Sequence, residues 1–146
     1  MDTTDAPQIL EHCHASLGFT PFDVKWIPSS ARFVLFGQSP KARGIFQIYQ
    51  IEKGKVHKVS DFDKEFGIKA GTFKASPIAM RDVATVDYKG KLCIFDIEYG
   101  KPKYSVQAHS TMANTIDGIG GKGAEYGAPE LVTGGSDGCV RVWDPR

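Results

Sequence analysis

The chain of 146 residues has no long hydrophobic run, and no stretch approaches the about 20 apolar residues that a membrane-spanning helix needs. An excess of charge is also lacking, because 18 Lys and Arg face 17 Asp and Glu and leave a formal net charge of +1. That balance predicts no nucleic-acid or polyanion partner. Residues 1–7 carry two acids and no apolar core, so we expect no secretory signal there.

Cysteine is scarce, and its three residues (Cys13, Cys93 and Cys139) are far apart and in no Cys-x-x-Cys pair. This predicts neither a disulfide framework nor a cysteine zinc site, and it favours a reducing, cytoplasmic setting. His12 and His14 would share one face of an extended strand, but no third ligand accompanies them. We therefore expect no bound metal and no cofactor.

Glycine and proline, with 16 and 8 residues, divide the chain into apolar segments that are mostly too short for a helix of average length. Most of these segments alternate apolar and polar residues, which is typical of a half-buried antiparallel strand. They cover residues 22–27, 32–36, 45–51, 68–73, 83–86, 91–97, 131–133 and 139–143. Residues 55–59 alternate in the same way, within a charged run from 53 to 64 that reads as a solvated edge and loop. The sequence predicts an all-β fold.

Two features recur along the chain at one period. A pattern of apolar, any, apolar, aromatic and polar residues places its aromatics at Tyr49, Phe95 and Trp143, in steps of 46 and 48 residues. A second series, at 24–26, 71–73 and 116–118, has steps of 47 and 45 residues. These lengths are close to the about 40–45 residues of a WD-type propeller blade.

The last of these units is the most specific. Residues 131–144 resemble the strand, turn and strand that end a WD repeat, and His109 stands where that family has its Gly-His. The resemblance implies a hydrogen-bonded tetrad of His109, Thr133, Asp137 and Trp143 that ties the inner turn of the blade to its third strand. Such a buried network stabilises only when every member is paired.

The two earlier units depart from this pattern. In the second, Thr85 matches Thr133, but Lys89 stands in place of the aspartate and Phe95 in place of the tryptophan. In the first, Tyr49 replaces the tryptophan and the loop at 38–43 is longer. We expect these two blades to rely on packing rather than on a tetrad.

Two motifs suggest chemistry. His109 and Asp137 beside a hydroxyl invite a hydrolase interpretation, but nothing supplies a nucleophile elbow or oxyanion donors, so we expect no catalytic residue and no enzyme. Residues 118–123 satisfy Gly-x-Gly-x-x-Gly, yet a loop broken by glycine and proline follows instead of the helix that a dinucleotide needs. We expect a long hairpin loop there and no small-molecule substrate.

Three cations form a candidate partner-binding rim. Lys41 and Arg43 lie in the widened turn of the first unit and Lys89 in the matching turn of the second. In a propeller these turns share one face, where the cations could attract an acidic peptide. A solvated rim is the alternative.

The chain as a whole resembles the Monad-type family of WD-repeat proteins, which are axonemal dynein assembly factors. The resemblance rests on residues 7–9, 22–28, 71–73, 84–85, 104–106 and 142–146, and above all on 116–121 and 127–130, which are not general WD features. It implies a cytoplasmic, non-enzymatic scaffold of the cilium-building pathway. The implied partners are a co-chaperone assembly of RuvB-like ATPases with prefoldin-like subunits, and dynein chains. The alternative is a propeller that reads peptides, as a histone-tail reader or a ubiquitin-pathway adaptor.

Members of that family carry seven blades, whereas this sequence accounts for about three four-stranded antiparallel ones. We assign residues 1–15 to a closing outer strand, 16–60 to the first blade, 61–107 to the second and 108–146 to the third. Repeat units bury their apolar faces only against neighbours. We therefore expect a fragment of a longer chain, or self-association that covers two exposed blade faces.

Overall fold

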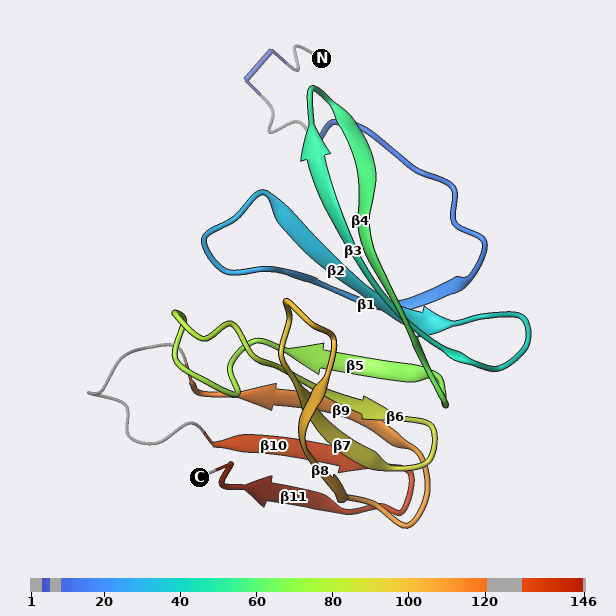
Figure 1. Ribbon diagram of the computed structural model, residues 1–146, viewed down its shortest axis with the longest axis vertical. Helices are drawn as coiled ribbons and strands as arrows, with labels where there is room; N and C mark the ends of the chain where they lie inside the picture. Colours follow the sequence, from blue (N-terminus) through green and yellow to red (C-terminus); the bar gives the residue numbers. More distant parts are fainter. Residues whose placement is uncertain (1–3, 6–8, 121–129, 146) are drawn as a thin grey trace.

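The computed structural model of the chain describes residues 4–5, 9–120 and 130–145. These residues form eleven strands and no helix (Figure 1). The strands are β1 (Thr20–Trp26), β2 (Arg32–Gln38), β3 (Gly44–Glu52), β4 (Lys55–Lys64), β5 (Ile68–Thr72), β6 (Val83–Asp87), β7 (Lys91–Phe95), β8 (Pro102–Gln107), β9 (Ala113–Gly118), β10 (Leu131–Gly135) and β11 (Val140–Trp143). Within the described ranges, no helix is long and apolar enough to cross a membrane.

The strands form three antiparallel sheets in the order of the sequence, which we call blades 1, 2 and 3. Blade 1 contains β1 to β4, blade 2 contains β5 to β8, and blade 3 contains β9 to β11. The predicted all-β class is confirmed, and the arrangement is that of a partial β-propeller. Among the described residues blade 3 has three strands rather than the expected four.

The sequence repeat corresponds to a repeat of strand register. Tyr49, Phe95 and Trp143 each lie on the third strand of their blade. Their partners on the second strand are Phe33, Val83 and Leu131. The same register makes Thr85 in blade 2 the counterpart of Thr133 in blade 3, so these two hydroxyls can be compared directly.

The outer strands differ most from the prediction. The charged run contains a strand of ten residues, β4, which ends at Lys64 and so extends past the predicted blade boundary at residue 60. β8 was not among the predicted strands, and all six of its residues are exposed, including Tyr104 and Val106. Residues 9–15 of the predicted closing strand form no strand here, and residues 1–3 and 6–8 lie outside the described part, so that role stays a prediction.

The inner strands of the blades lie next to one another. β1 contacts β5, and β5 contacts β9, as strands around a common axis would. The Asp23 carboxylate accepts a hydrogen bond from the backbone N–H of Gly71 at 2.8 Å and so joins β1 to β5. Gly71 has to be glycine, because a Cβ there would lie 2.4 Å from the Phe36 ring.

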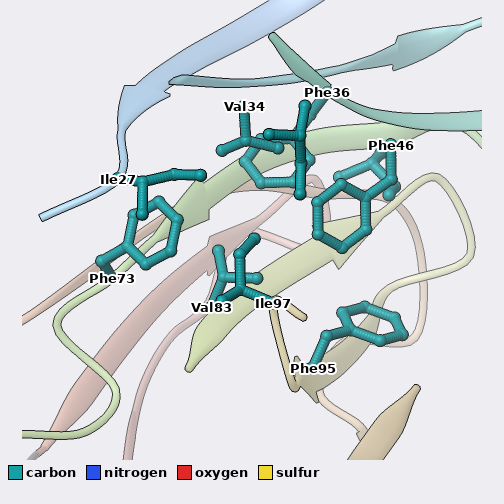
Figure 2. Packing of buried hydrophobic residues seen from close by; sticks show 10 residues of the cluster. Ile27, Val34, Phe36, Phe46, Phe73, Val83, Phe95 and Ile97 are labelled. Carbon is teal, nitrogen blue, oxygen red and sulfur yellow. The ribbon is translucent and has the colours of Figure 1, made fainter. Parts of the chain in front are cut away.

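An aromatic core fills the space between blades 1 and 2 (Figure 2). The Phe46 side chain is fully buried, and its ring centroid lies 5.2 Å from that of Phe36 and 5.8 Å from that of Phe95 on blade 2. The other buried members are Ile27, Val34, Ile48, Ile68, Phe73, Val83 and Ile97. The contact between Phe46 and Phe95 makes this core the link between the two sheets.

A second core lies between blades 2 and 3, so both faces of blade 2 are covered. Along β6, Val83 faces the first core while Ala84 and Val86 face the second, as the alternation of side chains along a strand requires. Leu131 of blade 3 is 1% exposed in this second core, and Trp143 packs against it. The free face of blade 3 is different, since Val140 and Val142 are exposed.

Candidate functional site

The four residues of the expected tetrad come from four different segments of the chain. His109 lies in the connection from β8 to β9, and Thr133 is the middle residue of β10. Asp137 lies in the turn from β10 to β11, and Trp143 is the last residue of β11. Antiparallel pairing of β10 and β11 places Trp143 opposite Leu131, at the end of β10 away from the Asp137 turn, and the indole side chain reaches Thr133 in the middle of the strand.

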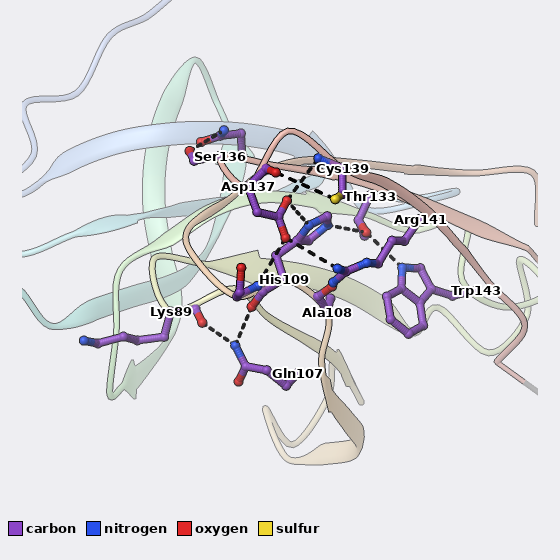
Figure 3. A network of polar contacts seen from close by, with 12 residues as sticks. Lys89, Gln107, Ala108, His109, Thr133, Ser136, Asp137, Cys139, Arg141 and Trp143 are labelled. Atoms are coloured by element: carbon purple, nitrogen blue, oxygen red, sulfur yellow. Dashed lines mark hydrogen bonds and ion pairs between the residues drawn. The ribbon is translucent and has the colours of Figure 1, made fainter.

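Three hydrogen bonds connect the tetrad in a chain (Figure 3). Trp143 Nε1 donates to Thr133 Oγ1 at 2.9 Å, and Thr133 Oγ1 lies 2.8 Å from His109 Nε2. His109 Nδ1 lies 2.9 Å from Asp137 Oδ1. Because a carboxylate only accepts, we assign the ring proton to Nδ1, so Nε2 accepts from the threonine hydroxyl. A neutral imidazole then satisfies every member of the network.

The Asp137 carboxylate, at one end of this row of hydrogen bonds, accepts more than the one bond from His109. It also accepts hydrogen bonds from the backbone N–H of Cys139 at 3.1 Å and of Ser110 at 3.2 Å. Burial acts to raise the pKa of Asp137, but the hydrogen bonds from His109, Cys139 and Ser110 outweigh it and lower the pKa from 3.8 to about 2. The carboxylate is therefore charged throughout the physiological pH range.

Gly135 leaves the space that the histidine ring occupies. A Cβ at this position would lie 2.3 Å from His109 Nδ1 and 2.8 Å from Asp137 Oδ1. The residue before the turn therefore has to lack a side chain wherever the tetrad forms. Sequence reasoning treated this glycine only as part of the repeat pattern.

Acid is expected to weaken the wild-type protein through Asp137. A folded-state pKa below the ordinary 3.8 means that the charged carboxylate stabilises the fold, so this contribution is complete above about pH 4 and lost as the pH falls toward 2. The difference in unfolding free energy between wild type and Asp137→Asn should therefore shrink between pH 5 and pH 2. Urea unfolding at several pH values measures it. Ser136→Ala is the control and should differ from wild type by the same amount at each pH.

Blade 2 lacks the tetrad and holds a cavity in its place. No hydrogen bond among the described residues reaches the Thr85 hydroxyl, although Thr85 is only 3% exposed. The Lys64 ammonium lies 4.2 Å from the centroid of the Phe95 ring and donates to the Gly100 carbonyl at 2.7 Å. Burial lowers the pKa of Lys64. A cavity of about 370 Å³ lies over Thr85, Lys64 and Phe95. Because Lys64 is the last residue of β4, this cation–π contact joins blade 1 to blade 2.

Blade 1 has a polar network that the sequence analysis missed. Tyr49 Oη donates to Gln47 Oε1 at 2.6 Å, Gln47 Nε2 donates to Asp61 at 2.8 Å, and Lys58 Nζ donates to the same carboxylate. Blade 1 therefore adds a polar network, different from the tetrad, to the packing that the sequence analysis expected. Tyrosine supplies a hydroxyl donor that phenylalanine lacks, and the partner lies on β4, which was not recognised as a full strand.

The turn that carries Lys89 is attached to the tetrad of the next blade. The carbonyl of Gly90 accepts hydrogen bonds from the backbone N–H of Ala108 and of His109, both at 2.9 Å. Gln107 Nε2 donates to the carbonyls of Lys89 and His109. The end of blade 2 and the histidine loop of blade 3 therefore form one hydrogen-bonded surface.

The candidate rim residues lie at the same end of their blades. Lys41 and Arg43 are exposed in the β2–β3 turn, and Lys89 is exposed in the β6–β7 turn; these turns lie on the right in Figure 1. Lys89 Nζ lies 5.4 Å from the centroid of the Phe66 ring. Among the described residues, no hydrogen bond or ion pair joins the three side chains.

The geometry also bears on the enzymatic alternatives. His109 and Thr133 are each 1% exposed, and the threonine oxygen that would act as nucleophile already accepts from Trp143. The Gly-x-Gly-x-x-Gly segment lies partly outside the described residues, at 121–123. Of the N-terminal histidines, His14 Nδ1 contacts Glu11 at 2.9 Å. No group of three His, Cys, Asp or Glu in the described ranges could hold a metal ion.

Fold and tetrad together define a class, an all-β protein built from propeller-type blades. No protein-family model matches the chain. Over its whole length the chain is 46% identical to Dynein axonemal assembly factor 10 of Chlamydomonas reinhardtii and 44% identical to that of Homo sapiens. The Danio rerio protein of the same name is 46% identical over 88% of the chain. The chain spans 41% of the length of the algal and human relatives.

Proposed function

We propose that the chain is part of a non-enzymatic, WD-repeat scaffold that takes part in the cytoplasmic assembly of axonemal dynein. The supporting observation is an identity of about 45%, along the whole chain, to proteins named as dynein axonemal assembly factors. A role in binding proteins agrees with what the described residues offer. The tetrad histidine is buried inside a blade, while the blade ends present exposed charged turns.

We further propose, from the resemblance to the Monad-type family, that the partners are dynein chains and a co-chaperone assembly of RuvB-like ATPases with prefoldin-like subunits. The rim of Lys41, Arg43 and Lys89 is the proposed contact surface. Proteins assemble through such surfaces when opposite charges meet, so an acidic segment is the expected counterpart.

A chimera tests the proposed role. The matching part of the Chlamydomonas relative is replaced by this chain, and the chimera is expressed in cells that lack the relative. We expect dynein arms and swimming to be restored, and the RuvB-like ATPases to co-purify with the chimera. The control is the same chimera with Lys41, Arg43 and Lys89 changed to Glu, which should reach equal abundance but lose co-purification. An unaltered lack of dynein arms in cells that contain the folded chimera would contradict the proposal.

A further inference from the structure

A groove of about 800 Å³ opens between blades 1 and 2, at the end of the blades opposite the β2–β3 and β6–β7 turns. Its walls include the β1–β2 turn and the long β5–β6 connection, residues 73–82, which lie on the left in Figure 1. Its volume is in the range of sites that bind drug-sized ligands or short peptide segments. Both blades that line the groove have four strands within the described residues.

The groove is apolar on its floor and also along its upper wall. Ile27 and Ile97 belong to the core between the blades and form the floor. Above them, Ile78 is 49% exposed and Met80 is 56% exposed on the β5–β6 connection, and Val59 of β4 is 44% exposed. Exposed apolar side chains that gather around one groove mark a site for a partner. Methionine adapts its shape to different partners.

The wall that carries Ile78 and Met80 is held in place. The backbone N–H of Asp82 donates to Ser76 Oγ at 3.1 Å, which closes the connection at its base. The Asp82 carboxylate, 6% exposed, receives the Lys103 ammonium at 2.7 Å. Inside the loop, the N–H of Met80 donates to the Pro77 carbonyl at 3.0 Å. The exposed side chains therefore belong to a connection that these three contacts hold in place.

The charges around the groove favour an anion. Its lining includes the side chains of Arg32 and Arg81 but a single acid, Glu98. Arg32 Nε donates to Gln50 Oε1 at 3.0 Å, and no ion pair among the described residues involves either arginine. A guanidinium presents parallel N–H donors that match a carboxylate. A groove that combines apolar side chains with serines and two arginines is complementary to apolar side chains that have a carboxylate beside them.

Arg81 is also held in an unfavourable backbone conformation. Its φ is 51°, in the left-handed region that residues with a Cβ rarely adopt. Ser29, on the opposite wall, has a φ of 54°. Lys53, in the β3–β4 turn and outside the groove lining, has a φ of 51°. Lys53 therefore provides a matched control with the same backbone strain.

We propose that this groove binds a short segment of a partner protein in which apolar side chains stand next to an aspartate or glutamate. The apolar side chains enter between Ile78, Met80 and the isoleucine floor, and the carboxylate pairs with Arg81. The inference rests on the proposed scaffold function and adds to it the chemistry of one partner segment. It concerns a surface different from the rim of Lys41, Arg43 and Lys89.

The test begins with a phage library of random dodecapeptides selected on the folded chain. The best peptide is then labelled with fluorescein and titrated against the wild type, Arg81→Gly and Lys53→Gly. Glycine relieves the left-handed strain in both variants, so both should fold and melt at or above the wild-type temperature. We expect selected peptides that are rich in Leu, Ile, Met or Phe next to Asp or Glu. Arg81→Gly should raise the Kd at least about tenfold, and Lys53→Gly should leave it unchanged.

Met80→Ser provides a second measurement at an exposed position, and it should raise the Kd of the same peptide. A failure to select peptides, a selection without acidic residues, or equal binding by Arg81→Gly and the wild type would each overturn the proposal. The dynein-assembly role is tested separately by the chimera. Restored dynein arms together with absent peptide binding would remove the groove and keep the proposed function.

Discussion

Thr133→Val is expected to lower the free energy of unfolding by about 1–3 kcal/mol, whereas Thr85→Val changes it by no more than about 0.5 kcal/mol. Both threonines are nearly fully buried, and both hold the same register position on the second strand of a blade. Valine keeps the shape and removes only the hydroxyl. In blade 3 this leaves Trp143 Nε1 and the buried His109 Nε2 without a partner. In blade 2 no hydrogen bond to the Thr85 side chain is lost.

Urea unfolding, followed by tryptophan fluorescence, measures both variants in the same way. Because Trp143 Nε1 donates to the substituted hydroxyl, Thr133→Val should also shift the native emission, which gives a readout independent of stability. Equal losses in the two variants would mean that the hydrogen-bonded tetrad contributes nothing beyond packing. Double substitution with His109→Ala should cost less than the sum of the single changes, because both remove the same network.

Phe46→Ala should have the largest effect of any single truncation considered for this chain, a loss of about 3–5 kcal/mol. The side chain is fully buried, and its ring contacts Phe36, Phe62 and Phe95 at centroid distances of 5.2, 5.4 and 5.8 Å. Phe95 belongs to blade 2, so truncation opens a cavity at the contact between blades. Unfolding should begin with the separation of blade 1 from blade 2.

Hydrogen exchange distinguishes the separation of blades 1 and 2 from a uniform loss of stability. In Phe46→Ala, protection should fall first in β3 and β7, which face each other across the core, and less in β10 of blade 3. Val24→Ala is the control, because Val24 is 55% exposed on β1 and its truncation should change the unfolding free energy by no more than about 0.5 kcal/mol. A loss below 1 kcal/mol in Phe46→Ala would contradict the description of this core as the link between the blades.

Most strands that sequence analysis identified have apolar residues buried against a neighbouring blade, whereas Val140 and Val142 of β11 are exposed. β6 is an example, because Val83 serves one core and Ala84 the other, and both side chains are fully buried. β8 was not identified; its Tyr104 and Val106 alternate with polar residues, but all six residues are exposed and none belongs to a buried core. β4 was shortened for a related reason, since its charged residues hide a strand that is held mainly by backbone pairing with β3.

The polar networks of blades 3 and 1 also differ in whether the sequence could predict them. The tetrad residues could be assembled from a resemblance, because the motif keeps their spacing. The network of Tyr49, Gln47 and Asp61 could not, because its aspartate is placed only by the pairing of Gln47 with Asp61 across β3 and β4. The absence of a tetrad around Thr85 was predicted, because Lys89 stands where blade 3 has its aspartate. The contact of the Lys64 ammonium with the Phe95 ring was not predicted.

By itself, the sequence determined the all-β class, the period of the repeat and the register-equivalent positions of Tyr49, Phe95 and Trp143. These follow from the alternation of apolar residues and from turn glycines, which act locally along the chain. Only the tertiary structure decided which side chains meet across blades, including the Phe46–Phe95 contact and the groove beneath Ile78 and Met80. Such contacts depend on how separate sheets stack. A surface formed by segments that are distant in sequence produces no pattern within either segment, so the sequence alone does not predict it.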